Sequence, residues 1–74
     1  MEYYKNLNGN SSIIAYKTYD DKIAVKFRDG KTYTYSYYKA GKEHVDNMKI
    51  LANNGCGLNS YIMRHVKYKY DNYY

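Results

Sequence analysis

Apolar and polar residues alternate most regularly between Lys22 and Tyr38. Each half of this stretch has an aliphatic or aromatic residue at every second position, which is the period of a strand with one buried face. These residues are Ile23, Val25, Phe27, Tyr33, Tyr35 and Tyr37. Asp29-Gly30 lies between the two halves and is a strong turn signal, because glycine adopts positive φ at no steric cost. The stretch therefore predicts a β-hairpin.

The length of the turn decides which way the tyrosines of the second strand point, because a slip of one residue exchanges the two faces of a strand. A two-residue loop places Tyr33 and Tyr35 on the same face as Lys26, which makes a basic aromatic platform on which bases can stack. A three-residue loop with Gly30 in the left-handed conformation places both tyrosines opposite the aliphatic residues of the first strand. We favour the three-residue loop, since it gathers the apolar residues on one face. The platform stays the alternative.

Three further segments have the pattern of regular elements. Residues 13–19 alternate like a strand and are joined to the hairpin by a short turn. Residues 42–52 have apolar positions at helical spacing, and residues 61 to about 70 form a second such segment. Asn59 or Ser60 is the expected N-cap of the second helix.

Together these elements predict an α+β fold, in which a three-stranded antiparallel β-meander is followed by two helices packed on one face. We expect residues 1–10 to be a flexible N-terminal arm, because they are polar and end in Asn8-Gly9-Asn10. Residues 11–70 form the expected domain, and residues 71–74 the expected C-terminal tail. A chain of 74 residues makes one domain with a modest core.

Several segments resemble the KTSC domain, a small domain that also occurs at the C-terminus of some lysyl-tRNA synthetases. The matching segments are Ser11-Ser12-x-Ile14, Tyr19-Asp20, Val25-x-Phe27-x-Asp29-Gly30-x-x-Tyr33-x-Tyr35 and Arg64-His65-Val66-Lys67-Tyr68. The resemblance covers about Ser11 to Tyr70. This chain lacks the proline-containing connection after the third strand, and its loop at 53–57 is slightly longer than the family's turn between helices. The resemblance implies RNA binding, with tRNA among the candidate ligands.

The balance of charge points to the same class of partner. The chain carries 12 Lys and Arg against 7 Asp and Glu, for a net charge of +5. Basic proteins bind polyanions because binding releases condensed counterions. The residues that we predict to bind RNA are Lys26, Arg28 and Lys31 around the hairpin, and Arg64, Lys67, Tyr68, Lys69 and Tyr70 near the C-terminus. The alternative for the hairpin lysines is that they only keep strand edges from pairing.

Two functions of different classes follow from these observations. The first is a small non-catalytic RNA-binding module, whose lysines and arginines contact phosphates and whose tyrosines stack on unpaired bases. The second is a phage-encoded protein-interaction factor that inhibits a host defence complex, for example a CRISPR complex, or a nucleic-acid-handling complex. A phage origin is suggested by 13 tyrosines and many Asn and Lys without Pro or Trp, a composition typical of AT-rich genomes. Exposed tyrosines would then act as binding hot spots.

We predict no catalytic, metal or cofactor site. Cys56 lies between two glycines, but nothing in the spacing of His44 and His65 ties either of them to it. One cysteine allows no intramolecular disulfide, and no apolar run has membrane-spanning length. No signal-peptide pattern is present, so the expected location is the cytoplasm, that of the host if the protein is phage-encoded.

Overall fold

The turn of the central hairpin has three residues, as expected. The hairpin joins strand β3 (Lys22–Phe27) to strand β4 (Thr32–Ser36). The Phe27 N–H donates to the Lys31 carbonyl over 2.9 Å, which closes the loop of residues 28–30. Gly30 has φ 91°, a conformation that favours glycine and extends the turn by one residue.

This turn sets the register that gathers apolar residues on one face. Val25 lies opposite Tyr33, and Ile23 lies opposite Tyr35. Ile23, Val25 and Tyr35 are at most 1% exposed, while Tyr33 is half-buried and packs against the same core. The prediction that Tyr33 and Tyr35 form a wall of the core is confirmed.

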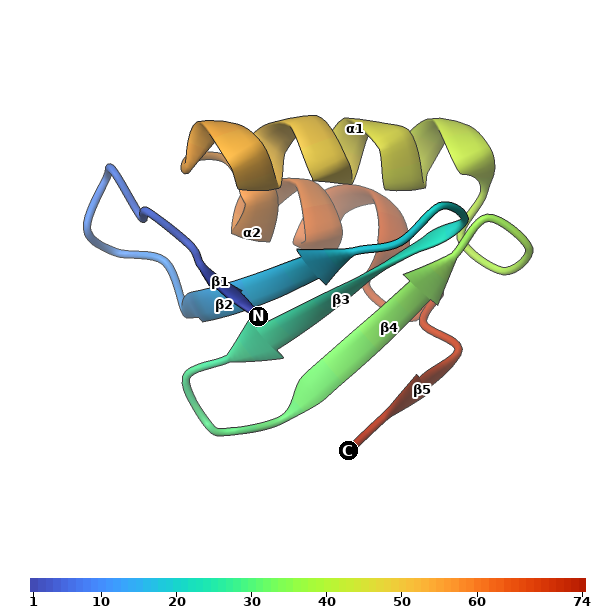
Figure 1. The fold of residues 1–74 in the computed structure, drawn as a ribbon, viewed down its shortest axis with the longest axis horizontal. Helices are drawn as coiled ribbons and strands as arrows, with labels where there is room; N and C mark the ends of the chain where they lie inside the picture. The colour runs from blue at the N-terminus through green and yellow to red at the C-terminus, as the bar shows by residue number, and fades with distance from the viewer.

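The computed structural model describes residues 1–74 and contains five antiparallel strands in the order β1-β2-β3-β4-β5, where three had been predicted. The remaining elements are β1 (Glu2–Tyr3), β2 (Ile13–Thr18), α1 (Lys42–Asn54), α2 (Leu58–Tyr61), the π-helical turn η1 (Ile62–Val66) and β5 (Asn72–Tyr73). Figure 1 shows the two short strands at opposite edges of the sheet, close to the two chain ends. The segment expected to be an arm supplies β1, and the segment expected to be a tail supplies β5.

The N-terminal segment belongs to the fold because Tyr4 is part of the core. Its side chain is 6% exposed, and its hydroxyl accepts a hydrogen bond of 3.3 Å from the Leu58 N–H. Three residues further on, the Leu7 N–H donates to the Gly55 carbonyl over 2.8 Å. These contacts tie the segment to the turn between α1 and α2, which a prediction from local polarity misses.

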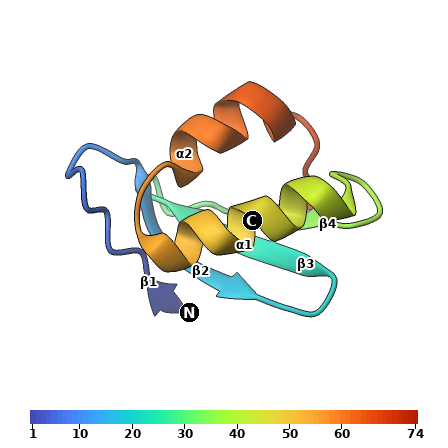
Figure 2. The same cartoon turned by 90° about the horizontal axis from the view of Figure 1, so that it is seen from above.

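The helices form one layer above the sheet, as Figures 1 and 2 show from two directions. Helix α1 ends at Gly55, whose φ of 85° is left-handed and whose N–H donates to the Leu51 carbonyl. Helix α2 begins at Leu58, three residues earlier than expected, so Asn59 and Ser60 lie inside it and do not cap it. Leu58 is fully buried, and this burial explains the earlier start. No helix has both the length and the apolar character needed to cross a bilayer.

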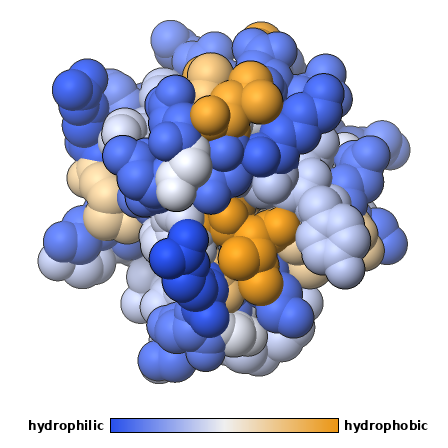
Figure 3. Space-filling view, turned by 90° about the vertical axis from the view of Figure 1, so that its left-hand side faces the viewer, coloured by the Kyte–Doolittle hydropathy of each residue, from blue (hydrophilic) through white to orange (hydrophobic).

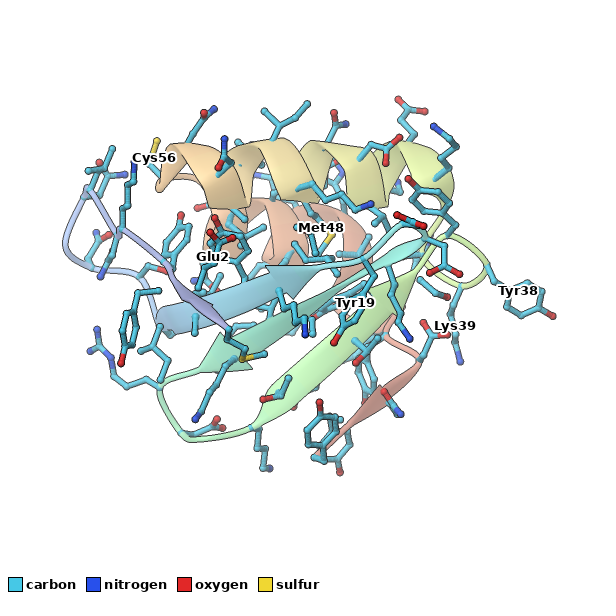
Figure 4. The ribbon with its side chains drawn as sticks, in the orientation of Figure 1. Glu2, Tyr19, Tyr38, Lys39, Met48 and Cys56 are labelled. Carbon is cyan, nitrogen blue, oxygen red and sulfur yellow. The ribbon has the colours of Figure 1, made fainter.

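The core lies between this helical layer and one face of the sheet. Its members are Tyr4, Ile13, Tyr16, Ile23, Val25, Tyr35, Ala40, Val45, Met48, Ala52, Leu58, Ile62 and Val66. Figure 4 shows Met48 in this space, pointing from α1 toward the strands. The predicted placement of the helices on one face of the sheet is confirmed.

We expect Tyr35→Ala to lower the free energy of unfolding by about 3–5 kcal/mol, because it removes a fully buried ring and leaves a cavity. Ile23→Val should cost about 0.5–1.5 kcal/mol and serves as a milder lesion of the same face. Tyr38 is 96% exposed, so Tyr38→Ala is the matched control and should stay within about 0.5 kcal/mol of wild type. Urea unfolding followed by circular dichroism measures all three. Equal midpoints for Tyr35→Ala and Tyr38→Ala would contradict the register.

Candidate nucleic-acid interface

A recess of about 250 Å³ lies where the end of the helical layer meets the hairpin, and we call it the aromatic recess. It is lined by Phe27, Asp29, Tyr33, Tyr35, Met63, Lys67, Tyr68 and Tyr70. The hairpin supplies the first four of these residues, and the other four come from η1 and the segment that follows it. The recess therefore joins the hairpin to the basic C-terminal segment.

Tyr33 is the centre of a cluster of rings at this recess. Phe27 and Tyr70 meet its ring edge-on, with ring centroids 5.4 and 5.0 Å away. Tyr73 of β5 stacks on it at 5.1 Å, with an angle of 20° between the planes. Such pairs contribute beyond simple burial, so the cluster holds its rings in fixed orientations.

The structure brings four of the predicted RNA-binding residues to this region. Lys67, Tyr68 and Tyr70 line the recess, and the Lys31 ammonium lies 5.4 Å from the centre of the Tyr73 ring. Tyr68 is 77% exposed, and the Lys67 ammonium lies 5.3 Å from the centre of its ring. The exposed Tyr68 ring and the Tyr73 ring, which stacks on Tyr33, thus each lie close to a lysine ammonium. Proteins that bind single-stranded nucleic acid combine aromatic rings with positive charges in this way.

The other four predicted residues lie elsewhere. Arg64 and Lys69 are exposed near the C-terminal end of the helical layer but do not line the recess. Arg28 donates from Nη2 to the Ser11 carbonyl over 2.9 Å, so its guanidinium holds the start of β2. Lys26 alternates with the core residue Val25 and therefore lies on the sheet face away from the helices.

Two residues at this region could not be assigned to it from the sequence pattern. Tyr73 had been placed in a tail, and nothing in a four-residue tail indicates which strand it will pair with. Met63 precedes Lys67 by one helical turn, and that spacing is the one local signal that places the two side chains together. Phe27 was expected in the core and is only half-buried, because it lies at the edge of the recess.

The inner wall of the recess is electrically neutral. Burial raises the pKa of the Tyr35 hydroxyl well above its ordinary value, and the neighbouring Tyr33 and Tyr70 hydroxyls raise it further. Tyr35 therefore keeps its proton at neutral pH. The positive charge of the lining belongs to Lys67, and Asp29 is the one acidic residue in it.

Both histidines and the cysteine lie apart from the lining of this recess. The Tyr61 hydroxyl accepts a hydrogen bond of 3.1 Å from the Asn47 amide and lies 2.8 Å from Nδ1 of His44. The His44 ring stacks on the His65 ring, with 5.4 Å between the ring centroids. Cys56 lies at the end of α1 (Figure 4) and lines a separate pocket of about 200 Å³ that no histidine lines. No three residues among His, Cys, Asp and Glu are placed so that they could hold a metal ion together.

Tyr70→Ala should lower the free energy of unfolding by about 1–3 kcal/mol, because it removes edge contacts to both Tyr33 and Tyr73. Tyr68→Ala should change it by less than about 0.5 kcal/mol, since this ring is 77% exposed. Thermal unfolding of both variants in one buffer measures the difference. Equal stability losses would mean that Tyr68 is a structural residue and is not free to bind a ligand.

No family model, curated protein or solved structure matches the chain. The resemblance to the KTSC domain therefore stays a prediction made from short segments of sequence. The fold and the geometry of the recess are the observations from which a function can be argued.

Proposed function

We propose that the protein is a small non-catalytic RNA-binding module that holds unpaired bases at the aromatic recess. The observation that carries the proposal is the exposed Tyr68 ring, which borders a recess lined by further aromatic rings and by Lys67. Sequence-specific RNA recognition targets loops and single strands, whose bases stack on aromatic side chains. The proposed ligand is accordingly single-stranded or looped RNA, and tRNA is one candidate.

The size of the recess suits one base. Pockets for drug-sized ligands have volumes of roughly 300–1,000 Å³, and this one has about 250 Å³. A flat ring can stack on Tyr68, the most exposed of the rings that line the recess. Stacking of this kind contributes about 1–3 kcal/mol per base and tolerates any base, since each has a π-face.

Phosphate contacts would supply most of the affinity. Lys67 lies at the recess and Lys31 beside the adjoining Tyr73 ring, while Arg64 and Lys69 extend the positive charge along the exposed C-terminal segment. With a net charge of +5, the whole chain also attracts polyanions at long range. Affinity that arises in this way decreases steeply as salt is added.

The protein-interaction factor is the alternative, and it has one supporting observation. Tyr38 is 96% exposed and, with Lys39, projects beyond the sheet from the loop after β4 (Figure 4). Figure 3 shows the side of the molecule opposite Tyr38, and this side is largely hydrophilic with small separate apolar patches. Scattered apolar side chains of this kind are normal on a protein surface. We therefore place RNA binding first.

Titration of labelled single-stranded RNA at several salt concentrations tests the proposal. Wild type should show a log–log slope of about −0.7 per phosphate contacted, and Lys67→Ala should make the slope shallower by about one contact. Tyr68→Phe should bind like wild type because it keeps the ring, while Tyr68→Ala should lose about 1–3 kcal/mol of binding free energy. Tyr38→Ala and Lys39→Ala are matched controls and should bind like wild type.

The result that would contradict the recess as the binding site is equal affinity for wild type, Tyr68→Ala and Lys67→Ala. Absence of binding at low salt would reject RNA binding altogether, and the interaction factor would then come first. A transfer RNA competitor, compared with an unstructured RNA of equal length, tells structured from single-stranded ligands. The ratio of absorbance at 260 nm to that at 280 nm, measured on freshly purified protein, shows whether nucleic acid co-purifies with it.

A further inference from the structure

The face of the sheet away from the helices carries a row of five residues, one from each strand or its extension. Tyr3 lies opposite Ala15, Ala15 opposite Lys26, and Lys26 opposite Thr32. The Thr32 N–H donates to the Tyr74 carbonyl over 2.7 Å, and the Tyr74 N–H donates back over 3.0 Å. Ala15 and Thr32 are each 6% exposed but do not belong to the core cluster. We call this surface the open face.

Lysines and small residues make up the rest of the open face. In the next row Lys17 lies opposite Ala24, and Ala24 lies opposite Thr34. In the row beyond, Lys22 lies opposite Ser36. Short side chains in the middle leave the surface shallow, so an extended ligand can lie across it within reach of the lysine ammonium groups.

Few acidic groups lie near the two longer rows. The Asp71 carboxylate accepts hydrogen bonds from the Ser36 N–H and hydroxyl, at 2.9 and 2.8 Å. Glu2 lies at the β1 edge, where it borders one pocket with Lys49 and Asn53 of α1 and another pocket with Lys17. Asp20 and Asp21 lie in the β2–β3 turn beyond the rows. The open face is therefore positive between its tyrosines.

The tyrosines of the open face present free rings. Tyr3 is 88% exposed and Tyr74 is 74% exposed. They lie four strand spacings apart, roughly 19 Å. Tyr19 adds a third ring at the β2–β3 end (Figure 4), with the Lys17 and Lys22 ammonium groups 5.3 and 5.0 Å from its centre. Strand β1 and the end of the chain thus place aromatic rings at both edges of a basic surface.

We propose that the open face is a second binding surface, which holds an extended single-stranded nucleic acid across the strands. Bases stack on Tyr3 and Tyr74, and phosphates between them contact Lys17 and Lys26. The inference rests on the proposed RNA-binding function and adds a contact surface on the opposite side of the sheet from the aromatic recess. Sheets that bind RNA use the same combination of stacking rings and cations.

A second copy of the chain is a poorer fit for this surface. Two open faces pressed together would bring the lysines of both copies into one interface, where like charges repel each other and oppose the association. A polyanion supplies the opposite charge and also gains from the release of counterions. Charge complementarity therefore selects nucleic acid as the occupant.

The test uses fluorescein-labelled oligo(U) and oligo(dT) of twelve nucleotides with the full chain. Tyr3→Ala and Tyr74→Ala should each weaken binding about 5- to 100-fold, while Tyr3→Phe keeps the ring and should bind like wild type. Lys17→Gln and Lys26→Gln should each make the salt slope shallower by about 0.7.

Tyr38→Ala and Lys39→Gln are the matched controls and should bind like wild type. Thermal melts of every variant exclude unfolding, and ultraviolet crosslinking with mass spectrometry should map the oligonucleotides to Tyr3 and Tyr74.

The outcomes separate this inference from the proposed function. If Tyr68→Ala weakens binding while folded Tyr3→Ala and Tyr74→Ala bind like wild type, the open face is overturned and the recess stands. If only the open-face variants weaken binding, the open face stands and the recess is rejected. Absence of binding to both oligonucleotides at low salt overturns both. A wild-type dimer in sedimentation that Tyr3→Ala dissociates would show that a second copy occupies the face, which also overturns the inference. Comparing oligo(U) with oligo(dT) tells RNA from DNA.

Discussion

The layered fold follows from the register of the β3–β4 hairpin. One left-handed residue, Gly30, adds the third position of the turn and so places Ile23, Val25 and Tyr35 on the face that the helices cover. A turn one residue shorter would exchange the two faces of β4 relative to β3, so that Tyr33 and Tyr35 would leave the helical side and threonines of β4 would take their place. The amphipathic pattern of the strands and the conformation of glycine at one position therefore agree, and together they fix the layered fold.

The two chain ends complete what the hairpin begins. Tyr4 closes the core at one edge, where its hydroxyl meets the first N–H of α2, and Tyr73 stacks on Tyr33 at the other edge. Each end also adds one exposed ring to the open face, Tyr3 at one edge and Tyr74 at the other. Alternation along each short strand and the residue that follows it explains the division, since neighbouring residues of an extended chain point to opposite faces. The same short segments thus stabilise the sheet and equip its surface.

The open face combines basic and aromatic residues, but they are not the residues that the alternative two-residue turn would have brought together. The two-residue turn would have built a basic aromatic platform from Tyr33 and Tyr35 beside Lys26. In the observed register those two rings belong to the helical side, and Lys26 instead shares its row with Tyr3 and Tyr74. The charged positions of β3 could be assigned from the sequence once the register was chosen. The aromatic neighbours of these charged positions could not be assigned from the sequence, because Tyr3 and Tyr74 lie at opposite ends of the chain.

The α+β class, the three central strands and the helices on one face could be predicted from the sequence, because they follow from local periodicity and turn chemistry. For the hairpin register, the same signals favoured the three-residue turn over its two-residue alternative. The sequence also indicated the basic C-terminal segment that borders the aromatic recess. Only the tertiary structure decided that residues 2–3 and 72–73 become edge strands, since pairing over such short lengths is stabilised by contacts with distant residues such as Leu58 and Tyr33. The start of α2 was decided in the same way, by burial of Leu58 in a core that no local pattern describes. Periodicity indicates which face of a helix or strand is buried, whereas the element that covers this face depends on the fold of the whole chain.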